Sequence, residues 1–139
     1  MRTFESASCK IYRIVFVTPT FSMKDYSNHF RELVQHQLGD DPRILVPRGA
    51  QDMMILATWR LSGDTVRPNK RSRMVRIVIS QEALEDYAGR TDDLRRASDE
   101  RFVAWFRHQL STFDPNHDSP LGVEPPSVTW PVGTGVLND

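Results

Sequence analysis

Cysteine is almost absent from the sequence, and so are long apolar runs. The single Cys9 excludes an intramolecular disulfide, and secreted domains of about 139 residues usually carry several, so we expect a soluble, cytoplasmic protein. The first ten residues, MRTFESASCK, lack the apolar core of a signal peptide. Apolar runs reach about five residues, as at 53–57, against the roughly 20 needed to cross a bilayer. We therefore expect no membrane-spanning segment.

An excess of charge of either sign is also lacking, as is any familiar catalytic motif. Lys+Arg and Asp+Glu each total 18, which argues against a protein that binds polyanions through its bulk charge. No GxSxG turn and no phosphate-binding loop occurs, so no enzyme class is indicated. Lysine is scarce, with three residues against 15 arginines. That bias favours a GC-rich, bacterial genome.

Apolar patterns in the sequence predict an α+β domain. β-branched and aromatic residues predict strands at 11–17, 43–46, 52–61 and 73–79. Helical spacing and capping residues predict helices at 23–38, 81–88 and about 92–112, the last with a core stripe of Val103, Phe106, Leu110 and Phe113. The order β-α-β-β-β-α-α, followed by an extended C-terminal tail, favours a two-layer sandwich. Its mixed or antiparallel sheet has about four strands, with the helices on one face.

The composition changes near the end of the last predicted helix. We expect residues 1–113 to form a single α+β domain and residues 114–139 to form a tail. The tail holds most of the prolines, four acids and no Lys or Arg, a composition typical of extended segments that order only on a surface. Proline also argues against a helix or a central strand there.

Three apolar residues in the tail alternate around proline. Val128, Trp130 and Val132 are predicted to anchor residues 123–132, in extended form, on the body of the protein or on a neighbouring subunit. Residues 133–139 are expected to fray. The acids of the tail suggest a further hypothesis, in which the docked tail masks a basic loop elsewhere in the chain.

That basic loop lies between the last two predicted strands of the domain. Six cations stand there against Asp64 alone, a net charge of +5 over residues 60–76. They are Arg60, Arg67, Lys70, Arg71, Arg73 and Arg76. Mobile guanidinium groups grip phosphates, and Trp59 and Asn69 would add stacking or polar contacts, so this hairpin is a candidate nucleic-acid or anion-binding site. The alternative is a solvated tip whose charges keep an edge strand from pairing with other chains.

Histidine and aspartate suggest metal sites only weakly. Asp114, His117 and Asp118 are close together, but a proline-bounded turn is the favoured explanation, and we predict no bound metal and no cofactor. His29 and His36 are seven residues apart on one helix, about 10.5 Å along its axis, which is too far to share one zinc ion.

These observations leave three classes of function. The first is a small non-catalytic interaction or regulatory domain, whose partner is another protein or a second copy of the chain. The alternative is a nucleic-acid-binding module that uses the hairpin at 60–76. The third is an enzyme whose site the sequence does not reveal. Binding to a membrane is not expected.

Overall fold

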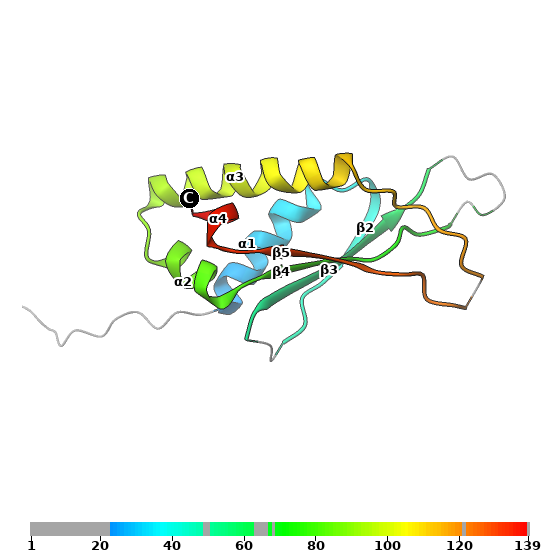
Figure 1. Cartoon of the computed structure of the whole chain (residues 1–139), viewed down its shortest axis with the longest axis horizontal. Coiled ribbons are helices and arrows are strands. Elements are labelled where there is room, and N and C mark those ends of the chain that lie inside the picture. Colours follow the sequence, from blue (N-terminus) through cyan, green and yellow to red (C-terminus); the bar gives the residue numbers. More distant parts are fainter. Residues whose placement is uncertain (1–22, 49–50, 63–66, 68, 121, 139) are drawn as a thin grey trace, which may run out of the picture.

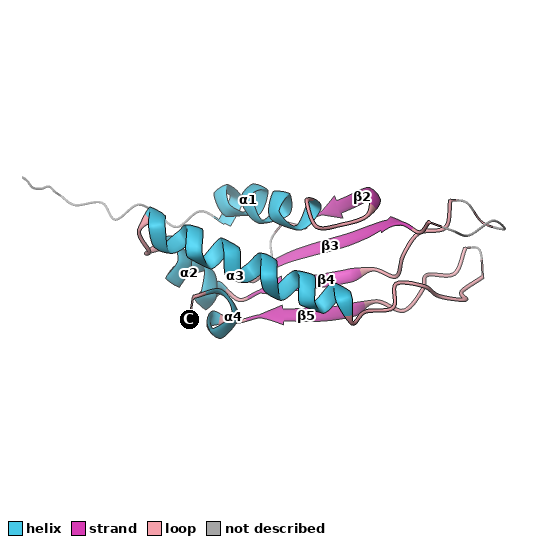
Figure 2. Ribbon diagram, turned by 90° about the horizontal axis from the view of Figure 1, so that it is seen from above, coloured by secondary structure: helices cyan, strands magenta, loops and turns pink. Residues whose placement is uncertain are grey.

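The computed structural model places the described helices on one side of a sheet, as Figures 1 and 2 show from two directions. It describes residues 23–48, 51–62, 67, 69–120 and 122–138. The elements follow the order α1 (Met23–Gln35), β2 (Asp40–Leu45), β3 (Met53–Arg60), β4 (Val75–Ile79), α2 (Gln81–Ala88), α3 (Asp92–Ser111), β5 (Val128–Val132) and α4 (Thr134–Leu137). The predicted strand at 11–17 lies outside the described residues.

The sheet has four strands in the order β2-β3-β4-β5. β3 pairs antiparallel with both β2 and β4, whereas β5 runs parallel to β4. The predicted fold class, an α+β sandwich with a mixed sheet, is confirmed. The predicted element order is wrong at its C-terminal end, because the segment beyond residue 113 contributes β5 and α4 rather than an extended tail alone.

Local sequence sets the helix boundaries. α2 begins after Ser80, whose hydroxyl accepts a hydrogen bond from the Ala83 amide at 3.1 Å, and ends before Gly89. α3 begins after Thr91, whose hydroxyl accepts from the Leu94 amide at 3.3 Å. Both helices match their predicted spans. α1 ends at Gln35, three residues earlier than predicted, in a tight turn that leads into β2.

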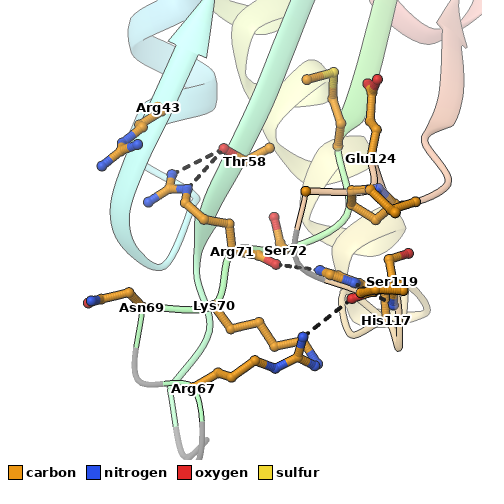
Figure 3. A pocket seen from close by; sticks show the side chains of 15 residues that line it. Arg43, Thr58, Arg67, Asn69, Lys70, Arg71, Ser72, His117, Ser119 and Glu124 are labelled. Carbon is orange, nitrogen blue, oxygen red and sulfur yellow. Dashed lines mark hydrogen bonds between the residues drawn. The ribbon is translucent and has the colours of Figure 1, made fainter.

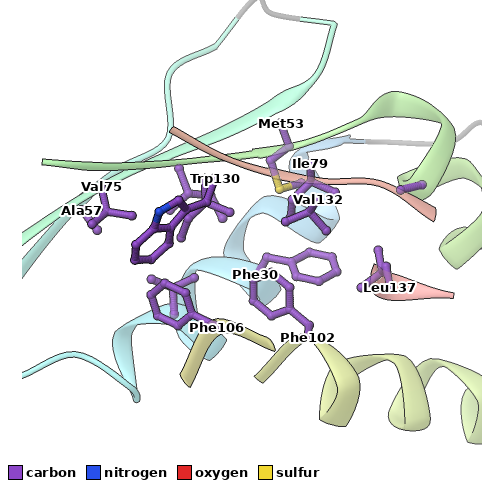
Figure 4. Packing of buried hydrophobic residues seen from close by; sticks show 14 of the residues in the cluster. Phe30, Met53, Ala57, Val75, Ile79, Phe102, Phe106, Trp130, Val132 and Leu137 are labelled. Atoms are coloured by element: carbon purple, nitrogen blue, oxygen red, sulfur yellow. The ribbon is translucent and has the colours of Figure 1, made fainter. Parts of the chain in front are cut away.

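The core lies between the sheet and the helices, as Figure 4 shows. β3 and β4 alternate strictly, so that one face is buried and the other is open. From the helices, Phe30 of α1 and Phe102 and Phe106 of α3 are fully buried, with ring centroids 5.3 Å apart for Phe30 and Phe102. The predicted stripe on α3 is confirmed for Phe106, which is buried, and for Leu110 and Phe113, which pack against the core. Its buried line follows Ser98, Phe102 and Phe106, and Val103 is only half-buried.

β5 closes one side of the core despite its proline. Trp130 and Val132 are buried and Val128 packs against the core, with the Trp130 ring 5.9 Å from that of Phe106. The Val128 amide donates to the Met74 carbonyl, and the Val132 carbonyl accepts from the Ser80 amide. The backbone amide and carbonyl groups of alternate residues in β5 thus point toward β4. Pro131 lies at one of the positions in between, where an amide would point away from β4, so its lack of an N–H removes no hydrogen bond from the sheet.

The expectation that residues 133–139 fray is wrong for 133–138. α4 packs on α2 and α3, and both Leu137 and Asn138 are buried. The Asn138 side-chain amide donates to the Ala83 carbonyl at 2.9 Å, and its side-chain oxygen accepts from the Ser98 hydroxyl at 3.3 Å. A buried amide with both ends bonded fixes the C-terminal segment in place.

The opposite face of the sheet carries no helix from the described part of the chain, and we call it the helix-free face. It combines apolar residues such as Leu56 and the 62 % exposed Leu45 with the cations Arg43 and Arg76. In the part of the chain that is described, no helix has the length and apolar character to cross a membrane.

Candidate anion-binding pocket

The hairpin between β3 and β4 continues beyond the two strands. Arg60 and Arg71 form an isolated antiparallel bridge, the Ser72 amide donates to the Trp59 carbonyl at 2.8 Å, and the Leu61 amide donates to Lys70 at 2.9 Å. The described part of the hairpin is thus an ordered extension of the sheet. Its side chains project from a defined backbone.

The segment after α3 runs along this hairpin and is bonded to it. The Arg73 amide donates to the Pro115 carbonyl at 2.8 Å, and the Lys70 ammonium donates to the Asn116 side-chain oxygen at 2.7 Å. The Arg73 guanidinium donates to the Asp114 and Pro126 carbonyls and lies 5.2 Å from the Phe113 ring centroid. We refer to residues 67–74 together with 113–127, where described, as the hairpin–tail region.

A pocket of about 610 Å³ opens between the hairpin, the tail and the end of β2 (Figure 3). Its charged lining residues are Arg43, Arg67, Lys70, Arg71 and Glu124. Its apolar lining residues are Met74, Pro120, Val123 and Pro125. Four cations and one carboxylate therefore surround a partly apolar cavity, in the size range of small-ligand sites.

Arg71 is the most firmly held of these cations. Its guanidinium donates to the Asp41 carboxylate at 2.9 Å, to the Asp41 carbonyl at 2.8 Å and to the Thr58 hydroxyl at 3.1 and 3.3 Å. Asp41 has the left-handed backbone conformation, with φ of 49°, inside an irregularity of β2. Burial lowers the pKa of Arg71, and the nearby positive charge of Arg43 lowers it further.

Arg43 is the most open of the four. Its side chain is 70 % exposed, and its closest anionic partner is the Asp41 carboxylate at 3.6 Å. Register explains its position, because Arg43 pairs with Thr58 across the β2–β3 ladder and so shares the helix-free face with it. Sequence reasoning missed Arg43, since the pairing of two strands joined by a loop is not visible in either strand alone.

Of the six predicted hairpin cations, Arg67, Lys70 and Arg71 line the pocket and the other three do not. Arg60 forms an ion pair with Asp40 at 2.6 Å, and Arg73 is bonded to the tail. Arg76 lies on the helix-free face, where its Nε atom is buried without a hydrogen-bond partner. Trp59 does not line the pocket either, although the neighbouring Thr58 does, because its side chain is buried on the helix-covered face beside Gly39.

The tail is held through backbone carbonyls and uncharged side chains rather than through its acids. Arg67 donates to the Ser119 carbonyl at 3.3 Å, and Arg76 reaches the Ser127 hydroxyl at 3.5 Å. Among the residues that the structure describes, no ion pair joins a tail carboxylate to a hairpin cation. The masking hypothesis anticipated the contact between tail and hairpin, but its charge pairing is absent from this part of the chain.

The weak metal candidates have other partners or lie apart. The Ser119 amide donates to His117 Nδ1 at 3.3 Å, so Nε2 carries the proton and donates to the Arg71 carbonyl at 3.0 Å. Asp114 accepts from the Asn116 amide at 3.0 Å, which forms a turn around its own backbone. Asp118 is exposed. No group of three metal-ligating side chains occurs within the described ranges.

A second titratable cluster joins α1, α2 and α3. The Asp99 carboxylate contacts His29 Nε2 at 3.0 Å and accepts from the Tyr87 hydroxyl at 2.9 Å. The hydrogen bond to Asp99 raises the pKa of His29, and burial raises the pKa of the Tyr87 phenol. The His29 ring and the Tyr87 hydroxyl are each bonded to the Asp99 carboxylate, which is the arrangement of a structural link between helices.

Comparison of the chain with protein-family models, with curated proteins and with solved structures finds no match. The function of the candidate site is therefore inferred from its geometry alone.

Proposed function

We propose that this chain is a non-catalytic binding domain that takes an anionic group of its ligand into the pocket between the hairpin and the tail. One observation carries the proposal. Arg43 comes from β2, and Arg67, Lys70 and Arg71 come from the hairpin, yet all four line one cavity. Clustering of like charges from separate segments raises the energy of the empty site, and a bound anion lowers it.

The electrostatics of Arg71 support the same conclusion. Its pKa is lowered by burial and by Arg43, which means that the surroundings destabilise its charged form. Asp41 offsets part of that cost through its carboxylate, at 2.9 Å from Arg71. An incoming carboxylate or phosphate would offset more, because it would accept charge-assisted hydrogen bonds from the same guanidinium groups.

Nucleic acid is the less favoured ligand. Single strands bind where bases stack on aromatic side chains, and the described residues of the helix-free face include no aromatic one. Each of the six hairpin cations also donates a hydrogen bond within the chain. An anionic small molecule, or an acidic side chain of a partner protein, fits the pocket between the hairpin and the tail better.

The proposal is tested by following backbone amide resonances of the full chain during titration with inorganic phosphate, an acidic peptide or a single-stranded oligonucleotide. We expect phosphate and the peptide to shift resonances around the pocket. Arg43→Gln should weaken binding about two- to tenfold, the effect of one partly exposed charge-assisted hydrogen bond. Arg107→Gln is the matched control, because Arg107 is exposed on α3 and away from the pocket.

Three results distinguish the alternatives. Equal affinity of the Arg43 variant, the Arg107 variant and the wild type would remove the pocket from the function. Shifts confined to another surface would do the same. An oligonucleotide that binds far more tightly than phosphate, with affinity falling steeply as salt rises, would favour the nucleic-acid alternative instead.

A further inference from the structure

Among the described residues that line the pocket, Glu124 is the one carboxylate, and its own surroundings are unusual. It is exposed, and no hydrogen bond or ion pair with any described residue engages it. Four cations line the same cavity without pairing with it. Figure 3 shows Glu124 on the opposite side of the pocket from Arg43 and Arg71. Arg43 and Arg71 therefore form a cationic side and Glu124 an anionic side, while Arg67 and Lys70 extend between them to the tail, where they donate to Ser119 and Asn116.

Apolar groups lie near the anionic side. Met74, Val123 and Pro125 line the cavity close to Glu124, two of them as its neighbours in sequence. A purely anionic ligand would leave Glu124 unpaired and would bring a second negative charge close to it. A ligand with a cationic group beyond a short apolar stem would instead pair with both sides and cover the apolar lining.

We infer that the pocket takes a zwitterion: an anionic group against Arg43 and Arg71, a short apolar stem, and an ammonium or guanidinium group against Glu124. This inference rests on the proposed anion-binding function and narrows it to a class of ligand. Glu124 acts in it as a specificity-determining residue, because it distinguishes a zwitterion from an anion of the same length.

Matched probes separate the contributions. Straight-chain alkanoates, the ω-amino alkanoates of the same length and the corresponding alkylamines, each with four, six or eight carbons, are titrated into the full chain and followed by amide resonances. At one length we expect the amino alkanoate to bind about two- to fivefold more tightly than the alkanoate, as one solvent-exposed ion pair provides. High salt should reduce that ratio.

The variants assign the effect to a residue. Glu124→Gln should abolish the preference for the amino alkanoate while the alkanoate still binds. Glu100→Gln, an exposed substitution on α3, should leave the preference unchanged. Arg43→Gln should weaken both carboxylate probes by the same factor, because each presents the same anionic group.

The possible failures differ for the two proposals. If alkanoates bind as tightly as amino alkanoates at every length, or if Glu124→Gln leaves the preference intact, the zwitterion inference is wrong and anion binding stands. If alkylamines bind as tightly as amino alkanoates, the cations that line the pocket contribute nothing to affinity, and the proposed anion-binding function is wrong. If no carboxylate probe and no phosphate shifts the pocket resonances, both proposals are wrong.

Discussion

The helix-covered face of the sheet and the hairpin–tail region are held together by different forces. On the first, aromatic rings from α1, α3 and β5 interlock, with Phe30, Phe102, Phe106 and Trp130 at centroid distances between 5.3 and 6.3 Å. In the second, cationic side chains donate to backbone carbonyls of the tail, in contact with solvent. Apolar side chains in the core gain no comparable interaction from water. Hydrogen bonds at the surface, in contrast, can be replaced by hydrogen bonds to water or to a ligand.

The difference assigns stability to one region and binding to the other. Removal of a core ring lowers the free energy of unfolding of the whole molecule, because the cavity that it leaves lies between the sheet and the helices. Removal of a bond in the hairpin–tail region opens a local segment and leaves the rest folded. A site that must admit a ligand is expected among such weakly held segments.

The largest effect is expected at the centre of the aromatic core. Phe106→Ala should lower the free energy of unfolding by about 3–5 kcal/mol, because its ring is fully buried against Phe102 and Trp130. Denaturant unfolding followed by circular dichroism measures this directly. Leu94→Ala, at a 49 % exposed position of the same helix, should change it by less than about 0.5 kcal/mol. A loss below about 1 kcal/mol for Phe106→Ala would show that the core is placed wrongly.

A smaller and local effect is expected in the hairpin–tail region. Arg73→Ala removes the hydrogen bonds to Asp114 and Pro126 and the contact with Phe113. Each such bond contributes about 0.5–1.5 kcal/mol, so hydrogen exchange at residues 113–127 should accelerate several-fold. Exchange in α3 should change less than in this segment. Uniform acceleration across the chain would mean that the two regions unfold as one unit.

The smallest effect concerns the link between α1 and α3, and it depends on pH. The hydrogen bond to Asp99 raises the pKa of His29 above its ordinary value of 6.5, with weaker support from the charge of Glu32 and opposition from burial. Tyr87 shares the same carboxylate. The stabilisation is therefore complete below about pH 6.5 and is lost as pH rises through the higher pKa of the folded state.

Comparison of His29→Gln with the wild type at a series of pH values tests this prediction. The difference in the free energy of unfolding should shrink as pH rises from about 6 to about 9. His36→Gln is the control, because His36 is exposed just beyond the end of α1. A difference that grows with pH would mean that His29 is stabilised in its neutral form.

Sequence predicted the elements whose signals are local. Ser80, Thr91 and Gly89 define the ends of α2 and α3 through contacts within a few residues, and those helices match their predictions. The predicted strands at 52–61 and 73–79 likewise correspond to β3 and β4. These patterns predict structure from residues that are close in sequence, so the rest of the chain is not needed to interpret them.

Elements whose position depends on distant partners were harder to predict. Proline argued against a helix or a central strand in the tail, and β5 is an outer strand, which tolerates Pro131 because the missing amide points outward. α4 is only four residues long, and Asn138 just beyond it is fixed by Ala83 and Ser98, more than 35 residues away. Three hairpin cations of the pocket were among the predicted residues. Arg43 and Glu124 were not, because they reach the pocket through strand register and the path of the tail.

The two outer strands of the described sheet limit how this protein associates with others. β2 contains Pro42 next to the left-handed Asp41, and β5 presents Pro131 outward. A chain that approached either strand in extended form would meet a missing donor, so growth of the sheet from molecule to molecule is opposed at both ends. Association through a ligand-filled pocket or a face of the sheet would therefore stay finite, whereas edge-to-edge stacking into fibrils would be disfavoured.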